Sequence, residues 1–98
     1  MTLQQIRDFA LTRPNQVFDL DEQCGCLVHH MTGRCVTMTH AGREPLPDEF
    51  VCFQSTLLNA TENTKYTGGQ LAESLTFIIE GGSPIDAAHN LEAAHANA

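Results

Sequence analysis

Prolines and glycines divide this sequence into segments that are each too short for a long helix. Pro14 closes the first segment, and Gly33 closes the second. The stretch AGREPLPDE, residues 41–49, contains one glycine and two prolines, and it predicts a loop. A Gly81–Gly82 pair, followed at once by Ser83 and Pro84, marks another boundary. Between these breaks we expect short helices.

Local signals predict where those helices begin. Thr2 and Gln5 have the spacing of a capping box, in which each side chain satisfies a backbone N–H of the other residue. Leucine and isoleucine recur at helical spacing between residues 67 and 80. Ser83 stands before Pro84, the usual order of a helix cap and first helical residue. Helices are expected to begin near residues 2, 21, 48, 67 and 83.

The predicted fold is mostly α: a small single-domain bundle of four to five short helices. Residues 34–40 alternate in polarity and are rich in β-branched residues, so they form either one short β element or irregular chain. The 98 residues suffice for one domain, 1–98. We expect its alanine-rich end, residues 93–98, to be a frayed tail.

The charge of the chain is strongly acidic. Twelve Asp and Glu residues oppose five Lys and Arg residues, for a formal net charge of −7. The five basic residues are scattered, so no basic stripe is available to neutralise phosphates, and we expect no direct nucleic-acid binding. An acidic surface favours a protein partner with a basic surface.

The N-terminal sequence MTLQQIRDFALTRP lacks the basic and apolar blocks of a signal peptide. No apolar run approaches the ~18 residues that a membrane span requires. We therefore expect a cytoplasmic protein that does not contact membranes and whose four cysteines are reduced.

The stretch CGCLVHHMTGRC, residues 24–35, gathers three cysteines and two histidines. A helix from Asp19 or Asp21 to Gly33 would give it two different faces. One face is an apolar core stripe made of Leu20, Cys24, Leu27, Val28 and Met31. The opposite face holds Glu22, Cys26, His29 and His30, and each of the other three lies about one helical turn from Cys26.

Three interpretations of this second face stay open. The first is a polar surface that contacts a partner protein. The second is a metal site, and the third is a reactive thiol, Cys26, whose pKa a neighbouring histidine lowers. In the second case Cys26, His29 and His30 would be the zinc ligands, although structural zinc sites usually add a second pair of ligands. We favour the partner surface, with no cofactor.

Phe77 lies about 100° from the centre of the apolar stripe in the helix expected over residues 67–80. It is either an anchor for a partner or the edge of the core. The candidate partner-binding residues are therefore Glu22, His29, His30 and Phe77. The sequence contains no catalytic motif, so we do not expect an enzyme.

Residues 18–33 resemble small bacterial and phage proteins in which an FDM-like segment leads into a helix with cysteine and glycine. Phe18-Asp19-Leu20, the run from Cys24 to His29, and Gly33 carry the resemblance, and a later helix that ends in glycine, here Gln70 to Gly81, is similar in kind. The sequence departs from the pattern at Leu20 and at the His29–His30 pair. The resemblance implies an origin and no activity.

The functional hypothesis is a small acidic, non-enzymatic protein-binding domain. Its size and charge are similar to those of phage-encoded inhibitors of host complexes, such as anti-CRISPR proteins. The alternative is a small Cys/His protein that binds metal or acts in thiol redox chemistry. A homodimer is a further alternative.

Overall fold

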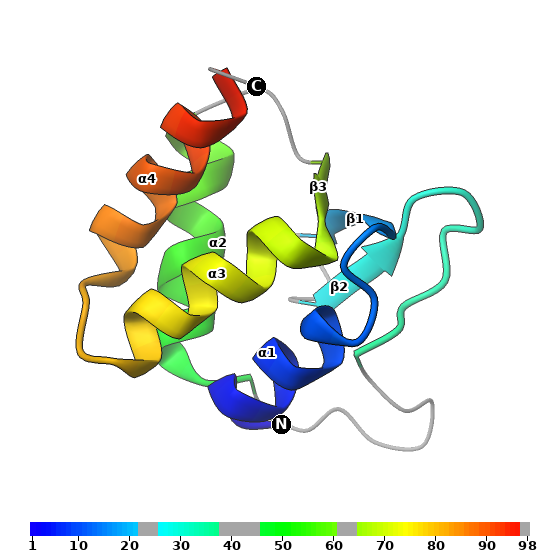
Figure 1. Ribbon diagram of the computed structural model, residues 1–98, viewed down its shortest axis with the longest axis horizontal. Coiled ribbons are helices and arrows are strands. Elements are labelled where there is room, and N and C mark those ends of the chain that lie inside the picture. Colours follow the sequence, from blue (N-terminus) through cyan, green and yellow to red (C-terminus); the bar gives the residue numbers. More distant parts are fainter. Residues whose placement is uncertain (22–25, 38–45, 61–64, 97–98) are drawn as a thin grey trace.

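The computed structural model describes residues 1–21, 26–37, 46–60 and 65–96 of the chain. Three strands form one small antiparallel sheet in the order β2-β1-β3, and helices make up most of the rest (Figure 1). The prediction of a mostly α domain is confirmed, although the sheet means that it is not a pure helical bundle. The elements are α1 (Leu3–Leu11), β1 (Val17–Asp21), β2 (Cys26–His29), α2 (Asp48–Ala60), β3 (Lys65–Thr67), α3 (Gly68–Ile79) and α4 (Pro84–Ala96).

Capping boxes start two of the helices. At α1, the Thr2 hydroxyl accepts a hydrogen bond from the Gln5 backbone N–H at 3.2 Å, and the Gln5 side chain accepts one from the Thr2 N–H at 2.8 Å. Thr67 and Gln70 repeat this exchange at the start of α3, at 3.2 and 3.0 Å. Both boxes satisfy backbone donors that have no partner inside the helix, which confirms the predicted start of α1.

The turn between α3 and α4 also follows from local chemistry. Gly81 adopts a φ of 102°, and its N–H donates to the Ile78 carbonyl at 3.0 Å. The Gly82 N–H donates to the Phe77 carbonyl at 2.9 Å, which completes a Schellman motif. Ser83 then caps α4, since its hydroxyl accepts from the backbone N–H two residues later at 3.2 Å. The predicted helix end and the predicted cap are both confirmed.

The helix expected between residues 21 and 33 is wrong. Strands β1 and β2 pair in antiparallel fashion instead, with Phe18 opposite His29 and Leu20 opposite Leu27. Phe18, Leu20 and Leu27 are buried, whereas Met31, which the helical prediction placed on the core stripe, has 82% of its surface exposed.

Period two explains this outcome better than the helical period. In VFDLD, the buried Phe18 and Leu20 alternate with acidic residues, which is the pattern of a strand with one face on the core. Leu20 and Leu27 fit either period, because they are seven positions apart on a helix and directly opposite each other in the hairpin.

Two shorter segments complete the sheet. Residues 65–67 form strand β3, where Tyr66 pairs with Phe18 and is buried. On the other edge, Cys35 makes an isolated bridge to Val28. The β element proposed at 34–40 is thus limited to this bridge as far as residue 37, and residues 38–40 lie outside the described residues.

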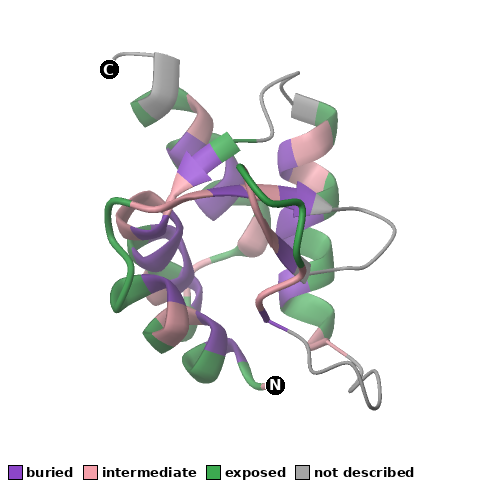
Figure 2. Cartoon of the chain, turned by 90° about the vertical axis from the view of Figure 1, so that its right-hand side faces the viewer, coloured by how far each residue is buried: buried purple, intermediate pink, exposed green. Residues whose placement is uncertain are grey.

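The core lies between the helices and the inner face of the sheet. In Figure 1, α3 lies between α1 and α4, α2 lies behind them, and the sheet closes one end; Figure 2 shows the buried residues gathered inside this arrangement. Phe9 of α1 contacts Phe18 of β1, with ring centroids 6.0 Å apart. The largest fully buried side chains are Tyr66, Phe18, Phe50, Phe53, Ile6, Leu27, Leu57, Leu71 and Leu75.

Candidate functional site

The hairpin separates the two histidines that the helical prediction had placed on one face. His29 is the last residue of β2, and His30 is the first residue of the turn that follows it. His29 pairs with the buried Phe18. His30 instead lies beside Asp19 on the outer face, with 3.2 Å between its Nδ1 and the Asp19 Oδ2. The two imidazoles therefore do not form one site.

His29 stabilises a turn. Its Nδ1 accepts a hydrogen bond from the Thr32 backbone N–H at 3.2 Å, and the Thr32 hydroxyl lies 3.1 Å from the same atom. The Gly33 N–H donates to the His29 carbonyl at 2.8 Å. These contacts close the turn that follows β2, which is a structural role.

Two more residues of this stretch were predicted to belong to the site. Glu22 lies outside the described residues, and so does the side chain of Cys26, whose backbone belongs to β2. Within the described ranges, no three His, Cys, Asp or Glu side chains converge on a point where a metal ion could sit. The helical spacing on which the zinc interpretation depended is absent, and the zinc alternative stays a prediction.

Asp19 was not among the site residues predicted from the sequence. Its side chain and that of His30 are 29% and 33% exposed, so the pair is partly screened by solvent. Its second oxygen, Oδ1, is buried and has no hydrogen-bond partner in the described part of the chain. The alternation F-D-L-D could have indicated that Asp19 faces outward and lies across the hairpin from the residues after β2.

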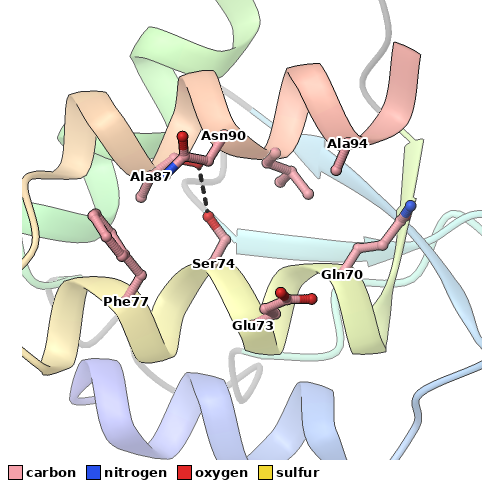
Figure 3. A pocket seen from close by; sticks show the side chains of 8 residues that line it. Gln70, Glu73, Ser74, Phe77, Ala87, Asn90 and Ala94 are labelled. Atoms are coloured by element: carbon pink, nitrogen blue, oxygen red, sulfur yellow. Dashed lines mark hydrogen bonds between the residues drawn. The ribbon is translucent and has the colours of Figure 1, made fainter. Parts of the chain in front are cut away.

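Phe77 belongs to a different region. Figure 1 shows β2 at one end of the molecule and the C-terminal end of α3, the helix that contains Phe77, at the other. Beside Phe77, α3 and α4 border a hollow of about 190 Å³ (Figure 3). Its lining combines small, apolar and amide side chains with one carboxylate: Gln70, Glu73, Ser74, Phe77, Ala87, Asn90, Leu91 and Ala94.

A second, more open hollow of about 400 Å³ lies on the other side of α3, toward α1. Glu73 and Phe77 line both hollows, and Glu80 lines the second. These three exposed residues follow one another at i, i+4 and i+7, so they form one ridge along α3. We call Glu73, Phe77 and Glu80 the α3 ridge.

Phe77 contacts the turn that follows α3. A Cβ atom at residue 82 would overlap the Phe77 ring, so the ring lies directly against the Gly82 backbone. The side chain nevertheless remains 39% exposed. It is thus an apolar surface group, and it belongs neither to the buried core cluster nor to the partly buried side chains packed against that cluster.

The ridge is acidic. Among the described residues, those that line the two hollows include Glu73 and Glu80 and no Lys or Arg. The nearby Arg7 donates to the Thr76 hydroxyl at 3.2 Å, and its charge is offset by Asp8 at 2.7 Å. No Lys or Arg follows Lys65 in the sequence, so α3 and α4 carry no basic residue of either kind.

The spacing Glu73-x3-Phe77-x2-Glu80 is visible in the sequence as one helical face. The hollow beside it was not predictable, because it depends on how closely α4 packs against α3.

No helix in the described part of the chain is long and apolar enough to cross a membrane. No protein-family model, no curated protein and no solved structure matches this sequence.

Proposed function

We propose that this chain is a small acidic, non-enzymatic domain that binds a partner protein through the α3 ridge and the hollow between α3 and α4. The binding role expected from the sequence is thereby assigned to Phe77 and its neighbours, and not to Glu22, His29 and His30.

The observation that supports this proposal is the position of Phe77. It is a partly exposed aromatic side chain that lies against the Gly82 backbone, lines two hollows, and has a carboxylate about one helical turn away on each side. Aromatic anchors in the centre of a polar rim supply most of the affinity of many protein interfaces. Acidic rims add attraction for a partner of opposite charge.

Photo-crosslinking tests this proposal directly. A photoreactive phenylalanine analogue replaces Phe77 in one variant and Val51 in a second, in cells that produce the full chain. Val51 is a suitable control because it lies on α2 and is similarly exposed, at 44% against 39%. We expect a specific protein adduct at position 77 that position 51 does not give. The same adducts at both positions, or no protein adduct at position 77, would contradict the proposal.

The narrower hypothesis is that the chain is a phage-encoded inhibitor or modulator of a larger host complex. Its support is the small size and the net charge of −7. Once crosslinking has identified the partner, adding the chain should reduce or change that partner's activity, and Phe77→Ala should abolish the effect. If the partner's activity is unchanged at a saturating concentration of the chain, the inhibitor hypothesis is wrong, and the binding proposal still holds.

A further inference from the structure

The α3 ridge has the charge and shape to select one kind of partner segment. We infer that its occupant is a short amphipathic helix of a partner protein, with an apolar side chain flanked by Lys or Arg one turn away on each side. This inference rests on the proposed function, because it specifies the chemistry of the partner at the same site.

The charge pattern of the ridge sets the first requirement. Glu73 and Glu80 are seven residues apart, which corresponds to about 10 Å along a helix axis at a rise of 1.5 Å per residue. A partner helix that packs alongside α3 presents its own residues at the same repeat. Basic residues about seven positions apart, with an apolar residue between them, would therefore meet both carboxylates while the apolar residue contacts Phe77.

The shape of the hollow sets the second requirement. Its walls are two helices, α3 and α4, whose backbone hydrogen bonds are internal, so no strand edge is available for an extended peptide. On α4 the exposed lining residue Ala94 is small, and Ala87, two turns earlier, is buried at the floor of the hollow (Figure 3). Small residues let a third helix approach closely, and a groove between two helices accepts the ridge of another helix.

The same charge argues against other occupants. Carboxylates on the ridge repel the anionic lipid headgroups that attract basic helices to membranes. A second copy of the chain would bring a second Glu73–Phe77–Glu80 ridge, so ridge against ridge would place like charges together. The basic helix of a different protein avoids both penalties.

Selection from a displayed library of helical peptides tests the inference, with the full chain as the target. We expect the selected helices to be enriched in Lys and Arg on both sides of an apolar residue. For a selected peptide, the double variant Glu73→Gln/Glu80→Gln should weaken binding about three- to tenfold, the effect of losing two exposed ion pairs. Phe77→Ala should weaken it by about tenfold or more.

The double variant Glu49→Gln/Asp86→Asn is the matched control. It removes the same amount of charge from exposed positions outside the two hollows, and we expect it to change the affinity less than about twofold. Equal weakening by both double variants would mean that only net charge matters, and it would overturn the inference. Selected helices without basic enrichment, or no selected helix at all, would overturn it as well.

Two results separate this inference from the proposed function. A protein adduct at position 77 together with failed helix selection would leave the binding proposal standing and reject the basic helix. Sedimentation that shows a dimer, lost in the Phe77→Ala variant, would instead assign the surface to a second copy of the chain and overturn the inference.

Discussion

The hydroxyl of Ser74 in α3 donates a hydrogen bond of 3.0 Å to the backbone carbonyl of Ala87 in α4. Both residues line the hollow beside Phe77, so this single bond joins its two walls (Figure 3). Ser74 is buried, and its hydroxyl would otherwise lack a partner in the apolar contact between the helices. The bond therefore contributes to holding α4 against α3 beside the α3 ridge.

Replacing Ser74 should loosen this contact. We expect Ser74→Ala to lower the free energy of unfolding by about 0.5–1.5 kcal/mol, the usual net contribution of a buried hydrogen bond. Ser55→Ala is the control, because Ser55 is exposed on α2, and it should change stability by less than about 0.5 kcal/mol. Denaturation in urea measures both values. A loss in Ser74→Ala no larger than that of the control would mean that the bond contributes nothing to the packing of α4.

The hairpin and the helix make opposite predictions for Met31. In the hairpin it is 82% exposed, so Met31→Ala should change the free energy of unfolding by less than about 0.5 kcal/mol. Phe18 is fully buried, and Phe18→Ala should cost about 3–5 kcal/mol. If residues 21–33 were a helix with Met31 on its core stripe, Met31→Ala would instead cost about 2–5 kcal/mol. Thermal or chemical denaturation of the two variants distinguishes these structures.

Two neighbouring glycines test how closely α1 and α3 pack. A Cβ atom on Gly68 would overlap the backbone oxygens of Ala10 and Arg13, and backbone has little freedom to move away. We expect Gly68→Ala to destabilise the fold by about 1–3 kcal/mol.

Gly69→Ala is the matched control, because the nearest atom to its Cβ would be the Pro14 oxygen at 3.4 Å, an ordinary contact. Since alanine favours helices over glycine, Gly69→Ala should be neutral or stabilising by up to about 1 kcal/mol. The unfolding midpoints of the two variants provide the measurement. Equal effects would show that the close approach at Gly68 is absent in solution.

A native mass spectrum tests the zinc alternative. Because the His29 Nδ1 accepts from Thr32 and the His30 Nδ1 lies 3.2 Å from an Asp19 oxygen, we expect protein purified without added metal to have the mass of the bare chain, unchanged by chelation. One zinc ion per chain, lost on chelation together with folded structure, would contradict this expectation. It would return Cys26, His29 and His30 to the centre of the functional question.

The ends of the helices were predictable because they depend on neighbours in the sequence. Thr2 and Gln5 bond to each other over three residues, and Gly81 and Ser83 act within the same turn. Such signals need no tertiary contact. The hairpin was missed because its apolar residues satisfy two periods at once, and the period alone could not decide between them.

For the candidate site, only part of the information was local. The sequence identified Phe77 as a residue off its helical stripe, and the acidic residues around it are visible at helical spacing. It did not indicate that Phe77 would lie against Gly82 or that a hollow would open beside it. It also placed two histidines with Phe77 in one candidate set, although β2 and the C-terminal end of α3 lie at opposite ends of the molecule (Figure 1).

The sequence by itself determined the mostly helical character of the chain, the caps of α1, α3 and α4, and the acidic charge, since each depends on residue types and short-range hydrogen bonds. Tertiary structure alone decided the sheet. Tyr66 pairs with Phe18 across nearly fifty residues, and a three-residue strand carries too weak a local signal to predict such a contact. The hollow between α3 and α4 was decided in the same way, because it exists only once Ser74 and Ala87 are brought together by packing.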